Sequence, residues 1–173
     1  RVFGGNNQGG TTGTTNVDAT TSTITDVFGG GDNASSTTSY VTIHSGTIDN
    51  VYGGGNEAGL TTSHVTILNG TIGNVFGGSN ESGDIATSNV NIGSNTTTPM
   101  ISNVYGGNNS GGTTTNANVT TTSGTIGTIY GGGKSAGVGA TNVSVTNTTA
   151  TDIYGGGVAA GVSTTTHLDL NSS

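Results

Sequence analysis

Few residues in this sequence are of the types that carry out chemistry. His44, His64 and His167 are far apart in the chain, at spacings that do not match those of metal-binding histidine pairs. The sequence contains no cysteine, so disulfide bonds, thiolate metal sites and cysteine nucleophiles are excluded. It also contains no P-loop or H-E-x-x-H motif. We therefore expect no catalytic residues, no metal site and no cofactor, and we expect that the protein is not an enzyme.

Acidic residues are the other candidates for chemistry. Asp32, Glu57, Glu81 and Asp84 lie near successive glycine runs, and Ca²⁺ is bound in proteins by carboxylate and carbonyl oxygens. Calcium-binding nonapeptide repeats, however, carry an aspartate in every repeat, and this chain does not. A site that cleaves polysaccharide would need basic residues beside the carboxylates, and the chain has only two. We interpret these acidic residues as part of a solvated surface.

The composition differs strongly from that of an ordinary globular domain. Glycine (34), threonine (36), asparagine (20) and serine (18) make up well over half of the 173 residues, whereas 28% are hydrophobic and 6% are charged. So few apolar residues argue against one large core, and so little charge does not fit a typical disordered chain. The net charge of −7 makes nucleic acid a poor partner. No apolar run is long enough for a membrane-spanning helix.

A single motif, [VI]-[FY]-G-G, recurs seven times along the whole chain. Its copies are separated by 24 to 29 residues, and most intervals are 24 or 25. Self-similarity at such a period is typical of repeat proteins, in which each unit packs only on its neighbours. The aromatic residues of the motif are Phe3, Phe28, Tyr52, Phe76, Tyr105, Tyr130 and Tyr154.

Each repeat also contains apolar residues at alternate positions. Pairs such as Val41 and Ile43, or Val65 and Ile67, have the period of two that is expected of a strand with one buried face. No apolar stripe with helical spacing is present, and glycine occurs in every unit. A further isoleucine precedes the aromatic residue by four positions, and we expect these residues to form one buried column: Ile24, Ile48, Ile72, Ile101 and Ile126.

These patterns predict an all-β fold, a parallel β-solenoid of about seven coils with about 24–25 residues per coil. Residues 1–173 would form a single domain with uncapped ends. We expect three short strands per coil, namely the V-x-I, G-T-I and V-[FY]-G-G segments, and positive φ angles in the glycine runs. The alternative of a β-propeller is less favoured, because a blade usually needs about 40 residues.

An asparagine-rich column follows the glycine runs, and two interpretations of it remain open. Asn56, Asn80 and Asn109 occupy equivalent positions, with Asp32 one repeat earlier. Stacked asparagine amides can hydrogen-bond along the axis of a β-stack. Alternatively, these residues cap the corners of the coils, because asparagine tolerates turn conformations. We favour the second interpretation.

The valine and the aromatic residue of each motif are adjacent, so on a strand they point to opposite faces. A strand that is apolar on both faces is normally covered on both. Two explanations are open: the solenoid is flattened so that both ladders are internal, or the outer ladder contacts another molecule. Because a thin coil has little room inside, we expect a sheet from the same chain or from a neighbour to cover one ladder.

The repeat resembles those of large surface-exposed β-solenoid proteins of prokaryotes, including adhesin-like proteins. The residues that carry the resemblance are the units V-[FY]-G-G-G-N and V-x-I-x-x-G-T-I-x-N, which cover the whole chain. The composition is similar to that of the amyloid-like structural proteins of archaeal cell sheaths. Both resemblances imply an extracellular protein at the cell surface or in the cell envelope, and neither implies catalytic residues.

We therefore expect a structural, self-assembling protein, a building block of a sheath, fibril or surface layer. Open strand edges at both ends would pair head to tail with other copies of the chain, and the aromatic ladder would provide lateral contacts. One alternative is that the chain is the stalk segment of a larger adhesin. A minor alternative is ice binding, because flat threonine ladders can order water, although the T-x-T pattern is not kept on every coil.

Overall fold

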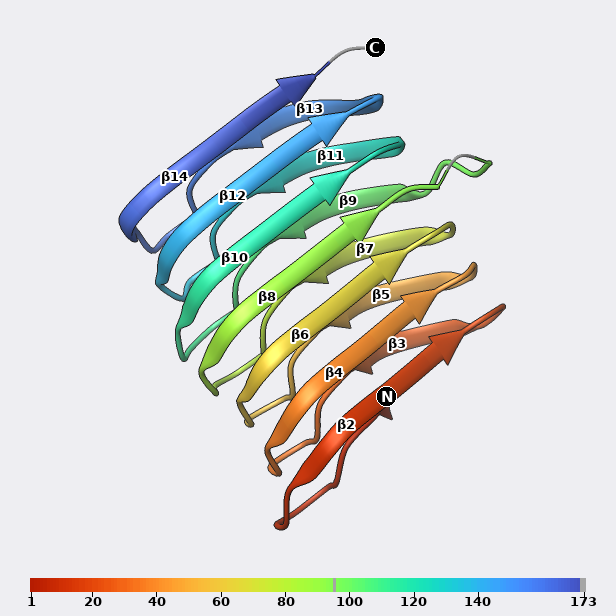
Figure 1. Cartoon of the computed structure of the whole chain (residues 1–173). Helices are drawn as coiled ribbons and strands as arrows, with labels where there is room; N and C mark the ends of the chain where they lie inside the picture. Colours follow the sequence, from red (N-terminus) through yellow and green to blue (C-terminus); the bar gives the residue numbers. More distant parts are fainter. Residues whose placement is uncertain (95, 172–173) are drawn as a thin grey trace.

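The computed structural model describes residues 1–94 and 96–171 and consists of two stacked parallel sheets (Figure 1). Each sheet has seven strands, and no helix occurs among the described residues. The odd sheet contains β1 Val2–Phe3, β3 Thr23–Phe28, β5 Thr47–Tyr52, β7 Thr71–Phe76, β9 Met100–Tyr105, β11 Gly124–Tyr130 and β13 Thr148–Tyr154. The even sheet contains β2 Thr12–Ala19, β4 Ser36–Ile43, β6 Leu60–Ile67, β8 Ile85–Ile92, β10 Thr114–Thr121, β12 Val138–Thr146 and β14 Val162–Asn171.

Successive repeats stack in register, which confirms the prediction of a parallel β-solenoid. In the odd sheet Val51 pairs with Val75 and Tyr52 with Phe76, so the repeated motifs lie directly above one another. The even sheet keeps the same one-repeat step, as between Val65 and Val90. The chain thus alternates between the two sheets and climbs one coil per repeat, as Figure 1 shows.

Each coil has two strands, so the prediction of three short strands per coil is wrong. The G-T-I and V-[FY] segments belong to one continuous strand, Thr47–Tyr52 in the third coil. Ile48 and Val51 both pack into the core although they are three residues apart. Strict alternation would place them on opposite faces. The strand therefore departs from alternation at Asp49–Asn50, and it does so without a turn.

The glycines that follow the aromatic residues are needed for close contact between coils and do not have positive φ angles. A Cβ atom on Gly53 would lie 2.4 Å from the carbonyl oxygen of Gly77, and one on Gly77 would lie 2.2 Å from that of Gly106. Positive φ angles occur instead at turns that enter the odd strands, for example 117° at Gly46 and 118° at Gly70, and before some even strands, at Gly83 and Gly112. The predicted location of the positive φ angles is therefore wrong.

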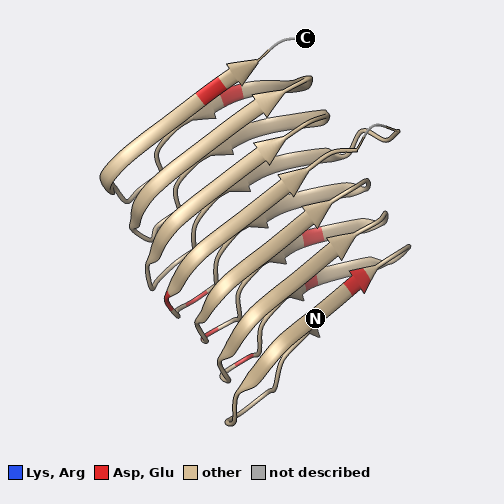
Figure 2. Ribbon diagram, viewed as in Figure 1, with Lys and Arg blue, Asp and Glu red and all other residues tan. Residues whose placement is uncertain are grey.

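The main core lies between the two sheets. Its valine and isoleucine side chains form columns that run along the stack, and those of the central coils are almost completely buried. Acidic residues lie outside this core, on the turns that lead into the even sheet, near both ends of the stack and, in the case of Asp49, on β5 (Figure 2).

Candidate assembly surface

The predicted isoleucine column lies inside the stack. Ile48, Ile72 and Ile126 are each 1% exposed and belong to the main core, together with Ile101. Ile24, near the first coil, is only partly buried but packs against the same cluster. Because each isoleucine contacts its equivalents one coil away, the column is continuous along the axis.

The predicted aromatic residues form one uninterrupted ladder on the other face of the odd sheet. Neighbouring ring centroids are 4.5 to 5.1 Å apart, and neighbouring planes differ by 4 to 9°. Phe28, Tyr52, Phe76 and Tyr105 form a buried cluster separate from the main core. The stack itself covers the two faces of each central ring. The expectation that a further sheet must cover this ladder is therefore wrong for the central rings.

Two polar ladders flank the aromatic rings. In one, Nδ2 of Asn56 donates to Oδ1 of Asp32 at 2.9 Å, and Asn80 and Asn109 continue the chain of bonds at 2.8 and 2.7 Å. The stacked-amide interpretation of this column is thus correct. The second ladder, two residues before the aromatic, was not predicted from the sequence. It has the same geometry, with bonds of 2.9 to 3.0 Å, and runs through Asp26, Asn50, Asn74 and Asn103.

Arg1 connects both polar ladders with the aromatic ladder at the first coil. Its Nε atom lies 3.7 Å from Oδ2 of Asp26, and one terminal nitrogen lies 3.9 Å from Oδ1 of Asp32. Its guanidinium carbon is 4.9 Å from the ring centroid of Phe3 and 5.0 Å from that of Phe28. One side chain reaches all these groups, so the three ladders run side by side.

The burial of the aromatic ladder raises the pKa of two of its tyrosines. Burial raises the pKa of Tyr52 to about 12, and the carboxylate of Asp26 adds to this effect. Burial also raises the pKa of Tyr105. A raised phenol pKa means that the neutral form is favoured in the folded state. These tyrosines therefore add no charge to the ladder at neutral pH.

A column of buried hydroxyl groups, also not predicted from the sequence, links the two sheets. Oγ of Ser63 donates to the carbonyl oxygen of Gly77, and Oγ of Ser88 to that of Gly106, each at 2.5 Å. Thr15, Ser39 and Thr141 make the equivalent bond in other coils. Each bond satisfies a glycine carbonyl at a corner, and at all of these corners except that of Gly155 the glycine packs too closely for a side chain.

Ala117 interrupts this hydroxyl column and provides a test of its contribution. Ala117 is fully buried and pairs with Ser88 and Thr141 on the neighbouring strands. The Ala117→Ser substitution should raise the free energy of unfolding by about 0.5–1.5 kcal/mol, the net value of a new intramolecular hydrogen bond. Urea denaturation would measure the change.

The matched control for this substitution is Ala140→Ser. Ala140 lies on the adjacent strand β12 but is only partly buried, in register with the exposed Asn116. Its substitution should change stability by no more than about 0.5 kcal/mol. A loss of stability in Ala117→Ser would contradict the role of the hydroxyl column.

The two end faces of the stack expose the apolar columns. Leu168 and Leu170 continue the valine and isoleucine columns of the even sheet, yet they are 40% and 59% exposed. Tyr154 ends the aromatic ladder and is 49% exposed. At the other end, Val2 is exposed and Phe3 is only partly buried. Within the described residues, β1 and β2 at one end and β13 and β14 at the other pair on one side only.

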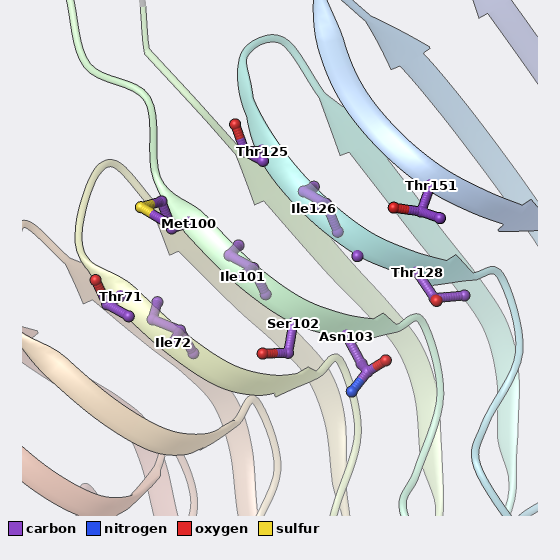
Figure 3. A pocket seen from close by; sticks show the side chains of 11 residues that line it. Thr71, Ile72, Met100, Ile101, Ser102, Asn103, Thr125, Ile126, Thr128 and Thr151 are labelled. Carbon is purple, nitrogen blue, oxygen red and sulfur yellow. The ribbon is translucent and has the colours of Figure 1, made fainter.

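A groove on the outer face of the odd sheet is lined by described residues without ionisable side chains. It lies over β9 and β11, where Gly127 has no side chain, and hydroxyl groups and Met100 surround it (Figure 3). No group of three or more His, Asp and Glu residues that could hold a metal ion is found in the described part of the chain. The described residues also form no helix that could cross a membrane.

Comparison of the chain with protein-family models, with curated proteins and with solved structures finds no match. The function must therefore be inferred from the geometry. Among the described residues, the geometry shows two end faces with matching columns.

Proposed function

We propose that this protein is a structural building block that assembles head to tail, outside the cell, into a filament, sheath or surface layer. The observation that carries the proposal is that the apolar columns continue to both end faces, where Val2 is exposed at one end and Tyr154, Leu168 and Leu170 are exposed at the other. A second copy that adds one more coil step would place Val17 over Leu168 and Ala19 over Leu170. It would also place Phe3 over Tyr154, so that the aromatic ladder continues without interruption.

Backbone pairing favours the same arrangement. An edge strand presents N–H and C=O groups that can pair with another chain. The described edges are parallel strands in the same register, so a second copy can add to both sheets at once. The contact joins two different surfaces, and repeated addition gives an open polymer. Because the central aromatic rings are already covered, we propose axial assembly without a lateral contact through the ladder.

Such a polymer suits a structural role outside the cell. Successive coils repeat the same backbone bonds, most coils add a hydroxyl bond, the central coils share the amide ladders, and the chain carries little charge. Stacks of this kind resist heat, detergent and protease. The resemblance to surface β-solenoid proteins and to sheath proteins supports the same proposal.

The residues on the outer face of the even sheet do not favour ice binding. Thr38, Thr62 and Thr87 are stacked in one column, but Asn116 and Ala140 continue it. In the next column Tyr40 stacks on His64, with ring centroids 4.7 Å apart. A flat surface of one repeated hydroxyl residue is therefore not formed.

The test is electron microscopy and sedimentation of the purified 173-residue chain over a range of concentrations. We expect filaments above a critical concentration. The double substitution Leu168→Asp with Leu170→Asp should raise that concentration roughly tenfold or more, because it places unpaired carboxylates against Val17 and Ala19 of the next copy.

Met100→Asp is the matched control. Met100 is 58% exposed, as much as Leu170, but it lies on the side of the stack, at β9. It should leave the critical concentration nearly unchanged. Single short rods at all concentrations would contradict the proposal and would favour a stalk segment of a larger adhesin. Filaments of the Leu168→Asp, Leu170→Asp chain at the parent concentration would contradict it as well.

A further inference from the structure

The end faces carry charged residues at positions that the repeat brings together. Arg1 occupies the position two residues before the first aromatic, and the equivalent residue of the last odd strand is Asp152. On the even sheet, Asp18 lies on β2 and Asp169 occupies the equivalent position on β14. Each pair belongs to one column, whose first and last members are at opposite ends of the stack.

The contact that Arg1 makes within its own chain shows that residues one coil apart in this column lie beside each other. Val2 and Phe3 pair with Val27 and Phe28, which places Arg1 beside Asp26. The resulting distance from Nε to Oδ2 is 3.7 Å. Asp152 occupies the same column, since it pairs with Thr128 and precedes Ile153 and Tyr154. A second copy that continues the stack therefore places its Arg1 within ion-pair reach of Asp152.

On the even sheet the same step brings two carboxylates together. Asp18 pairs with Thr42 and Asp169 pairs with Ser144, so Asp18 of the second copy would lie directly beside Asp169. Directly opposed like charges on neighbouring strands are destabilising.

Among the described residues, the other titratable side chains near these carboxylates are two histidines. His44 lies 3.4 Å from Asp18, and His167 is two residues before Asp169. Strand β12 presents only Asn142 and Ser144 beside this part of β14. The repulsion between the two carboxylates is therefore not relieved by a lysine or arginine of either strand.

We propose that these two charge pairs control the head-to-tail contact between copies. Arg1 with Asp152 sets the polarity and register of the junction, and Asp18 with Asp169 limits its affinity. The inference rests on the proposed function, because it concerns contacts between copies of the 173-residue chain. Arg1 also lies over the Phe3 and Phe28 rings. At the junction it would contact the exposed ring of Tyr154 in the same way, which adds a cation–π contact.

Three substitutions that each remove one negative charge from the net charge of −7 test this inference. Asp152→Asn removes the attractive pair, Asp169→Asn removes the repulsive pair, and Asp49→Asn is the control. Asp49 is exposed on β5, in the third coil and away from both end faces. Because the three chains have equal net charge, differences among them report local contacts at the junction.

We expect the critical concentration for polymerisation to be lowest for Asp169→Asn, intermediate for Asp49→Asn and highest for Asp152→Asn. Each step should be roughly two- to fivefold, the range measured for exposed ion pairs. Measurements in about 0.01 M and about 1 M salt, where the screening length falls from about 30 Å to about 3 Å, should show that the differences disappear at high salt.

The outcomes separate the inference from the proposed function. Filaments from all three chains with equal critical concentrations would overturn the inference and leave head-to-tail assembly standing. The reverse order, with Asp152→Asn below Asp169→Asn, would also overturn it. No filaments from the parent or from any variant would overturn both.

Discussion

The Ile72→Asp substitution is expected to unfold the stack, with a loss of more than about 4 kcal/mol in the free energy of unfolding. Ile72 is 1% exposed, and it lies between Ile48 and Ile101 in the column of the main core. A carboxylate at this position would be buried without a partner. The total stability of a domain is only about 5–15 kcal/mol, so one such change removes a large part of it.

The position of Ile72 increases the effect. Strand β7 belongs to the fourth of the seven coils, and each coil packs only on its neighbours. Disruption there divides the stack into two short pieces, each with little buried surface. Circular dichroism during thermal unfolding would measure the loss, with Met100→Asp as an exposed control on the adjacent strand. An Ile72→Asp chain that melts at the parent temperature would show that this column does not stabilise the fold.

The fold class was predictable because the signal repeats. Seven copies of one motif at a nearly constant interval define the coil, and alternation of residues such as Val41 and Ile43 defines the buried face of a strand. Parallel stacking in register then follows, because equivalent residues can lie above one another in every coil. None of this depends on the details of a turn.

The number of strands per coil was not predictable from alternation alone. Ile48 and Val51 both face the core although they are three residues apart, and the sequence interpretation placed a corner between them. Glycine occurs between the corresponding residues in some repeats, as at Gly73, but Asp49 occupies that position one coil earlier. The strand continues there because its backbone pairs in register on both sides.

The hydroxyl column had a signal in the sequence. Ser39 and Ser63 stand two residues before Val41 and Val65, so they extend the buried face of the strand by one position. A small polar residue on a buried face must have a hydrogen-bond partner. The partner itself, a glycine carbonyl of the next coil, could not be inferred, because it depends on how closely the corners pack.

The aromatic ladder was identified from the sequence, but its environment was not. We expected a further sheet to cover one ladder, since adjacent residues of a strand face opposite sides. The rings instead cover one another at separations of 4.5 to 5.1 Å, and amide ladders lie on either side. Side chains in one stacked column thus achieve burial that alternation within a single strand does not predict.

Replacing Tyr52 and Phe76 together by serine is therefore expected to abolish stable folding of the central coils. The two rings are adjacent in the ladder, 5.0 Å apart, and are 5% and 2% exposed. Removal of a buried aromatic side chain costs roughly 3–5 kcal/mol. The two losses share one cavity, between the Phe28 and Tyr105 rings, so they should not be independent.

Thermal unfolding and electron microscopy of the same samples distinguish whether the ladder stabilises the fold or joins copies of the chain. Tyr154→Ser is the matched control. Tyr154 is 49% exposed and has a ring neighbour on one side only, so its loss should lower the melting temperature little but weaken assembly. If the Tyr52→Ser, Phe76→Ser chain remained folded and lost only its polymers, the central rings would belong to an interface between copies. Loss of folding in the double variant, with Tyr154→Ser still folded but weakened in assembly, would show that one ladder stabilises the coil in the middle of the stack and joins copies at its end.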